Sequence, residues 1–86
     1  FGVPVSGLAG ARVLEIGCAS GNNLLPLAYQ MPADCRFLGI DLSTRQVEAG
    51  RERVAALGLP NVELRVQDLL EFGDGEGHFD YIIVHG

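Results

Sequence analysis

Two glycines and an acidic residue in this chain have the spacing of a nucleotide-cofactor site. A mainly apolar run ends at Gly17, a loop of small residues follows, and Gly21 precedes a segment with helical spacing. Twenty residues after Gly21, a second apolar run ends in Asp41. A glycine turn lets the backbone approach a ligand closely, and an acid at the tip of the next strand can hold ribose hydroxyls. The spacing therefore predicts a site for an adenosine-containing cofactor.

The elements that must position these residues alternate between strand and helix patterns. A capping box starts the second helix at Ser43, and Gly58 ends it. Pro26 fits the first helix only in its first turn. We expect strands at 12–16, 36–41, 62–66 and 81–84, helices at about 22–31 and 43–57, and a turn with a short helical piece at 68–72. This alternation predicts an α/β fold with a parallel Rossmann-like sheet in the order 3-2-1-4.

The winding direction of such a sheet reverses between its first and fourth strands, and ligands bind beside the carboxyl ends of the strands at that reversal. The strand at 81–84 is apolar on both faces, which predicts a central position with a neighbouring strand and a second helix layer. Because the sequence up to Gly86 encodes neither, we expect residues 1–86 to be the N-terminal part of one domain. The complete domain would be a three-layer sandwich, in which a missing C-terminal half or a second copy covers strand 81–84.

Composition and charge narrow the class of protein. The chain is 48% hydrophobic and 20% charged, as in an ordinary globular domain. No apolar stretch approaches the roughly 20 residues needed to cross a membrane, and the N-terminus does not resemble a signal peptide. The six basic residues are all arginines, scattered along a chain of net charge −5, which argues against nucleic acid as a partner. We expect a cytoplasmic protein.

The two cysteines are not expected to form a disulfide. Cys18 should follow the first strand and Cys35 should precede the second, at opposite ends of neighbouring parallel strands. This places them roughly 17–20 Å apart, whereas a disulfide needs Cα atoms within about 7 Å. Free thiols fit a reducing compartment.

Four ordered motifs resemble the class I S-adenosylmethionine-dependent methyltransferases and cover nearly the whole chain. The loop at 15–21 is similar to the family's E/D-x-G-x-G-x-G motif, with Ala19 in place of the middle glycine. The other motifs are the acids after the second and third strands, in 41–43 and 67–69, and the hydrophobic run introduced by Phe-Asp at 79–86. The sequences of residues 17–28 and 79–86 resemble, more specifically, a bacterial subgroup with an added regulatory domain, some of whose members are protein-lysine methyltransferases.

The resemblance implies S-adenosylmethionine as the cofactor. Glu15 would help to hold its ammonium group, directly or through water; a carboxylate inside a central strand otherwise carries a high cost of burial. The loop would pack its backbone against the methionine part of the cofactor through Gly17, Cys18, Ala19 and Gly21. A generic strand-to-helix turn is the alternative explanation for the two glycines, and Cys18 is better explained as a small filler than as a nucleophile.

The acids after the second and third strands are expected at the adenosine part of the cofactor. Asp41, followed by Leu42, would accept both ribose hydroxyls; capping the next helix is the alternative, but Ser43 suits that role. Asp68 would accept a hydrogen bond from the adenine amino group, with the backbone of Leu69 nearby. Turn formation is the alternative for Asp68.

His85 is expected at the tip of the fourth strand, beside the methyl-donor end of the cofactor. It could contact the cofactor, orient a nucleophile or accept its proton, but a histidine that merely closes a strand explains the position equally well. No Cys/His cluster has metal-ligand spacing, and no nucleophile–base–acid triad is recognisable. We therefore assign no metal ligand and no catalytic residue.

The resemblance implies that the complete protein transfers a methyl group to an unidentified acceptor, either protein or small molecule, while the isolated chain has little or no activity. One alternative is an NAD-dependent Rossmann dehydrogenase. Its G-x-G-x-x-G fingerprint would need glycines where Ala19 and Asn22 stand. Another alternative is a non-enzymatic half-domain that associates through the edge of strand 81–84.

Overall fold

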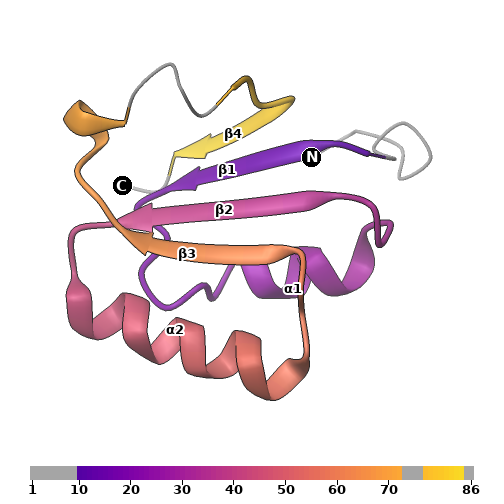
Figure 1. The fold of residues 1–86 in the computed structure, drawn as a ribbon, viewed down its shortest axis with the longest axis horizontal. Coiled ribbons are helices and arrows are strands. Elements are labelled where there is room, and N and C mark those ends of the chain that lie inside the picture. Colours follow the sequence, from indigo (N-terminus) through magenta and orange to yellow (C-terminus); the bar gives the residue numbers. More distant parts are fainter. Residues whose placement is uncertain (1–9, 73–76, 85–86) are drawn as a thin grey trace.

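The strands and helices of this chain follow one another in the predicted order. The computed structural model describes residues 10–72 and 77–84, so the expectation for His85 lies outside the described residues. Figure 1 shows the elements β1 (Arg12–Ile16), α1 (Leu24–Gln30), β2 (Arg36–Asp41), α2 (Thr44–Leu57), β3 (Val62–Val66), the 3₁₀ helix η2 (Leu69–Glu71) and β4 (Tyr81–Val84).

The strands form one parallel sheet in the order β3-β2-β1-β4, which confirms the predicted topology. Leu14 of β1 lies opposite Leu38 of β2 and Ile82 of β4. Because all neighbouring strands run in the same direction, the segments that follow β1, β2 and β3 leave the sheet at the same edge. This is the edge at which the sequence predicts the cofactor site.

Both α-helices cover the same face of the sheet (Figure 1). Val13, Phe37 and Leu64 of the strands share a buried core with Leu24 of α1 and Val47 of α2. Of the three layers expected for the complete fold, the described residues supply the sheet and one helix layer.

The ends of the helices follow local sequence signals. The Ser43 side chain accepts a hydrogen bond from the Gln46 N–H at 3.3 Å, and Gly58 ends α2 with a φ of 64°. Helix α1 is shorter than expected, because Met31 has extended backbone with ψ of 161°. A residue that precedes proline is pushed out of the helical region, and Pro32 follows directly. Pro26 lies in the first turn of α1, as predicted.

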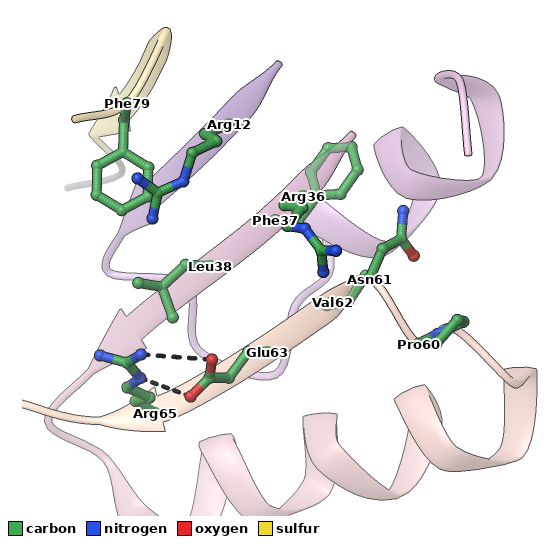
Figure 2. A pocket seen from close by; sticks show the side chains of 10 residues that line it. All are labelled: Arg12, Arg36, Phe37, Leu38, Pro60, Asn61, Val62, Glu63, Arg65 and Phe79. Carbon is green, nitrogen blue, oxygen red and sulfur yellow. Dashed lines mark hydrogen bonds and ion pairs between the residues drawn. The ribbon is translucent and has the colours of Figure 1, made fainter. Parts of the chain in front are cut away.

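The sheet face away from the helices combines apolar and basic side chains. Its buried residues Leu14, Leu38 and Ile40 pack against Phe72 and Phe79. Beside them lies a hollow of about 150 Å³, whose lining includes the arginines of three strands (Figure 2): Arg12, Arg36 and Arg65.

Strand β4 lies at the edge of the described sheet, with Ile82 58% exposed and Val84 72% exposed. Its central position in a complete sheet remains a prediction. Cys18 and Cys35 are both buried and free, which confirms that they do not pair. Within the described ranges, no helix has the length and apolar character required to cross a bilayer.

Candidate functional site

The loop after β1 turns across the carboxyl end of β2. The backbone N–H groups of Gly17 and Cys18 both donate to the carbonyl of Ile40, at 2.9 and 3.1 Å. Gly17 and Gly21 have φ angles of 80° and 83°, a region that is costly for residues with a Cβ. Glycine at these two positions lets the loop reverse direction within a few residues.

The carboxylate of Asp41 joins this loop to the start of α2. Its Oδ2 accepts a hydrogen bond from the N–H of Ala19 at 2.9 Å, and its Oδ1 accepts one from the N–H of Ser43 at 2.8 Å. The capping of α2 falls to the Ser43 side chain, as expected. Because each carboxylate oxygen has two lone pairs, both oxygens of Asp41 keep acceptor capacity for ribose hydroxyls.

Asp68 begins the short helix η2. Its Oδ1 accepts a hydrogen bond from the N–H of Leu70 at 2.9 Å, so the turn-forming role considered for this residue is present. A carboxylate can hold a turn through one oxygen and offer acceptor capacity to a ligand. Asp68 is therefore suited to both roles.

A hollow of about 230 Å³ lies beside the loop and brings together half of the predicted contacts. Those contacts are Gly17, Asp41, Leu42, Asp68 and Leu69, and the remaining lining residues are Ile16, Ile40 and Gln67. The sequence points to Gln67 only as part of the motif with Asp68. Its backbone N–H donates to the carbonyl of Asp41 at 2.9 Å, which holds the ends of β2 and β3 together beneath the hollow.

Glu15 does not line this hollow, although the resemblance implies that it helps to hold the same cofactor as Asp41 and Asp68. Successive side chains of a strand point to opposite faces, and Ile16 takes the side of the hollow. Glu15 lies on the helix side with an exposed fraction of 0%, and Asn23 donates to its Oε2 at 3.2 Å.

The remaining loop residues, Cys18, Ala19 and Gly21, do not line the hollow either. Burial, and then the negative charges of Glu15 and Asp41, raise the pKa of Cys18 to about 11. A thiol with this pKa is protonated at neutral pH and is a poor nucleophile. Cys18 packs tightly, because a Cβ at Gly39 would lie 2.8 Å from its Sγ. Both observations fit Cys18 as a small residue that fills space in the loop and does not react.

The far side of the loop is fastened to α2. The Arg53 Nη1 donates to the Asn22 Oδ1 at 2.7 Å. Helix and loop also approach closely at Gly50, where a Cβ would lie 2.8 Å from the carbonyl oxygen of Ser20. The loop is thus held from two sides, by Asp41 and by α2. Among residues 10–72 and 77–84, no three His, Cys, Asp or Glu side chains gather in a way that could hold a metal ion.

A parallel sheet with a glycine loop and an acid after β2 is compatible with more than one class of nucleotide-cofactor protein. A family model for a methyltransferase domain matches residues 13–86. The chain belongs to this methyltransferase domain family. The match decides against the dehydrogenase alternative and confirms the resemblance drawn from the four motifs.

The methyltransferase domain has relatives among both sequences and solved structures. An uncharacterized protein of Rickettsia prowazekii is 41% identical over 86 residues, which are 100% of this chain and 15% of that protein. The aklanonic acid methyltransferase of Streptomyces sp. (strain C5) is 33% identical over 76 residues, 88% of this chain and 34% of that enzyme. The structure of PKMT2 from Rickettsia typhi in complex with AdoHcy matches with a TM-score of 0.83 and 42% identity, over 90% of this chain and 15% of PKMT2. The chain thus spans about 15% of the length of these two Rickettsia relatives.

Proposed function

We propose that this methyltransferase domain binds S-adenosylmethionine at the hollow beside the β1 loop, and that the whole protein transfers the methyl group to a protein or small-molecule acceptor. The observation that carries the proposal is the meeting of Gly17, Asp41 and Asp68 around one hollow at the carboxyl ends of the strands. The similar PKMT2, solved in complex with AdoHcy, supports the same class of ligand.

The polar groups around the hollow fit the adenosine part of this cofactor. The two oxygens of Asp41 are held in place by backbone N–H groups and would accept the two ribose hydroxyls through their remaining lone pairs. Asp68 would accept from the adenine amino group, beside the backbone of Leu69. Leu42 and Ile40 supply apolar surface for the flat ring.

The hollow is smaller than the roughly 300–1,000 Å³ of a typical small-molecule pocket. At about 230 Å³, it suits one part of the cofactor, so the amino-acid end would extend along the loop at Gly17. Glu15 lies beneath this loop and would act on the ammonium group through an intervening polar group.

The bound cofactor supplies an electrophilic methyl group on a sulfonium, so methyl transfer needs little acid or base catalysis by the protein. This chain would contribute by binding and orienting the cofactor through Asp41 and Asp68, so that an acceptor can approach in line. His85 remains a predicted contact. The free buried cysteines fit a reducing cytoplasm, which we include in the proposal.

Calorimetric titration of the chain with S-adenosylhomocysteine (AdoHcy) and, separately, with NAD tests the proposal. We expect one AdoHcy to bind per chain and NAD to give no signal. Asp41→Ala should abolish AdoHcy binding, whereas Asp34→Ala, at an exposed acid ahead of β2, should leave it unchanged. Binding of NAD, or AdoHcy binding that survives Asp41→Ala, would contradict the proposed site.

A further inference from the structure

Asn23 occupies the N-cap position of α1, but its side chain makes no capping hydrogen bond. An N-cap side chain normally accepts from the second or third N–H of its helix. Here the second N–H, of Leu25, donates to the carbonyl of Gly21 at 2.9 Å. The third residue is Pro26, which has no N–H. Because of this sequence, the Asn23 side chain does not cap α1, as an asparagine at this position usually does.

The Asn23 side chain instead contacts Glu15. The Asn23 Nδ2 donates to the Glu15 Oε2 at 3.2 Å, so a residue of the loop-to-helix junction contacts the central strand β1. Glu15 is fully buried, whereas Asn23 is exposed. The amide of Asn23 thus connects the buried carboxylate to the surface on which the amino-acid end of the cofactor would lie.

The chemistry of this contact suits a carboxylate that must keep its charge. An amide N–H fixes the direction of a carboxylate through a hydrogen bond, but adds no positive charge to neutralise it. A lysine or arginine at position 23 would compete with a ligand ammonium for Glu15. An asparagine instead orients the carboxylate and leaves its negative charge to act on the ligand.

We infer that Asn23 is a positioning residue that sets the Glu15 carboxylate for recognition of the ammonium group of the cofactor. The inference rests on the proposed function and deepens it, because it assigns selectivity for the amino-acid end of the ligand to the pair Asn23–Glu15. Ligands that share the adenosine part but lack the amino group gain nothing from this pair.

The test compares two ligands on the same chain: AdoHcy, and 5′-methylthioadenosine, which lacks the amino-acid end. Asn23→Ser keeps a good N-cap residue but is too short to reach Glu15. We expect it to weaken AdoHcy binding about tenfold, because a Glu15 carboxylate that is no longer oriented interacts less well with the ammonium group, while 5′-methylthioadenosine binding changes less than about twofold. Asn61→Ser serves as the matched control and should affect neither ligand: it also removes an amide hydrogen bond, from Asn61 to the Cys35 carbonyl at 2.8 Å, but at the amino end of β2.

A double-mutant cycle shows whether Asn23 acts through Glu15. In a Glu15→Gln background, Asn23→Ser should cause no further loss of AdoHcy affinity. Asn23→Gln, which keeps the amide donor, should recover part of the wild-type affinity. Thermal unfolding of each variant identifies any that does not fold, and the remaining variants then complete the test.

The outcomes separate this inference from the function on which it rests. An equal loss for both ligands in Asn23→Ser would show a purely structural role, and unchanged AdoHcy affinity would show no role at all; either result overturns the inference while cofactor binding stands. If the wild-type chain binds neither ligand, the proposed function fails, and the inference fails with it.

Discussion

The backbone N–H of Ala19 donates a hydrogen bond to the Oδ2 of Asp41 at 2.9 Å, across 22 positions of the chain. The other oxygen of the same carboxylate holds the N–H of Ser43. Asp41, which the resemblance assigns to ligand binding, is therefore also a structural link between the loop and α2. Changes at Asp41 should affect ligand affinity and conformational stability together.

Asp41→Asn tests this double role. The amide of asparagine offers one acceptor oxygen, so one of the two backbone N–H groups would face an NH₂ group. We expect the free energy of unfolding to fall by about 1–3 kcal/mol, the usual cost of an unsatisfied donor. Urea denaturation measures the change, with Asp34→Asn as a control that should not move the midpoint. An unchanged midpoint for Asp41→Asn would show that the two hydrogen bonds contribute no stability.

Ala19→Gly should leave the chain as stable as the wild type or make it more stable. Ala19 has a φ of 49°, which costs a residue with a Cβ roughly 1–2 kcal/mol, whereas glycine adopts this φ freely. Glycine also gives the unfolded chain more conformational freedom, which lowers the free energy of unfolding by about 0.4–1 kcal/mol and offsets part of the strain that is relieved. The same change at Ala55, inside α2, should destabilise by about 0.5–1 kcal/mol. Thermal melts of both variants check the contrast; a loss at position 19 as large as that at 55 would contradict it.

The pKa of Cys18 predicts a loss of stability at high pH. Burial raises it from the ordinary 9.0 to about 11. Below pH 9 both folded and unfolded chains hold the proton; between about pH 9 and 11 the unfolded chain releases it first, so stability falls as the pH rises. The loss should approach roughly 2–3 kcal/mol.

Denaturation of wild type and Cys18→Ala between pH 8 and about 11 isolates this contribution, because the other titrating groups are common to both chains. The difference in unfolding free energy between the two should be constant up to pH 9 and then shrink. A difference that stays constant over the whole range would contradict the raised pKa.

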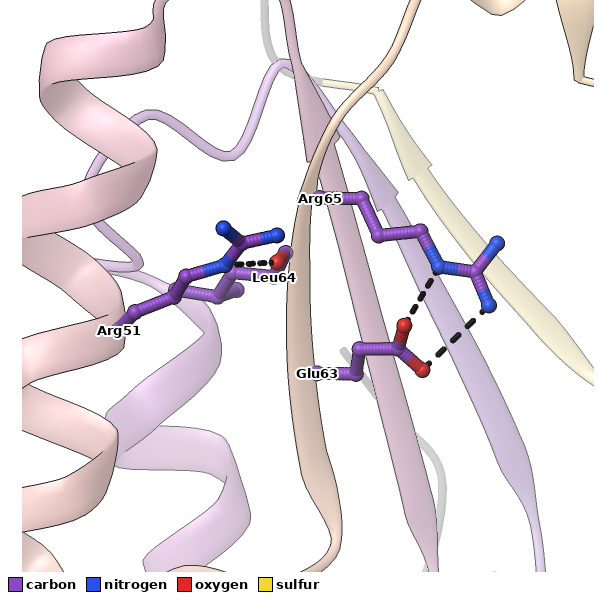
Figure 3. Close-up of polar contacts among 4 residues, drawn as sticks. All are labelled: Arg51, Glu63, Leu64 and Arg65. Carbon is purple, nitrogen blue, oxygen red and sulfur yellow. Dashed lines mark hydrogen bonds and ion pairs between the residues drawn. The ribbon is translucent and has the colours of Figure 1, made fainter.

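Arg51 should contribute more to stability than Arg45, the first arginine of α2. Its Nε donates to the backbone carbonyl of Leu64 at 2.8 Å and so fastens α2 to β3 (Figure 3). Arg51→Met, which keeps the aliphatic stem, should lower the free energy of unfolding by about 0.5–1.5 kcal/mol, the usual net contribution of one hydrogen bond. Arg45→Met, on an exposed residue in the first turn of α2, is the matched control in urea denaturation. Equal effects at both positions would mean that the contact with Leu64 contributes nothing.

The elements could be predicted because their signals are local. Alternation and apolar runs give the bounds of the strands. Ser43 marks the start of α2 because its side chain accepts a hydrogen bond from a backbone N–H of the first turn, and Gly58 marks the end because it adopts the left-handed conformation. The sheet order followed from the handedness of the crossovers. Pro32 correctly predicts where the first helix stops, but α1 ends one residue earlier than expected, at Gln30, because the residue before a proline is also pushed out of the helical region.

The candidate site was predictable only where residues directly follow strands. Asp41 and Asp68 had to reach the same edge of the sheet, and they line one hollow there. Strand alternation already places Glu15 on the face opposite to Ile16, so its absence from the hollow could have been predicted, whereas its contact with Asn23 follows from no spacing rule. The arginines of β1, β2 and β3 line a hollow on the sheet face away from the helices (Figure 2), where the register pairs Arg12 with Arg36, whereas Arg65 lies opposite Ile40, farther along β2.

Gly50 restricts how this domain can diverge. Because a side chain there would lie within 2.8 Å of the Ser20 carbonyl and 2.5 Å of the Leu64 Cδ1, replacement requires the loop backbone and a core residue to shift as well. The two partners are separated from Gly50 by 30 and 14 positions of sequence. In related proteins, position 50 should therefore change only together with compensating substitutions near positions 20 and 64. An alignment of related sequences should show this as covariation among the three positions.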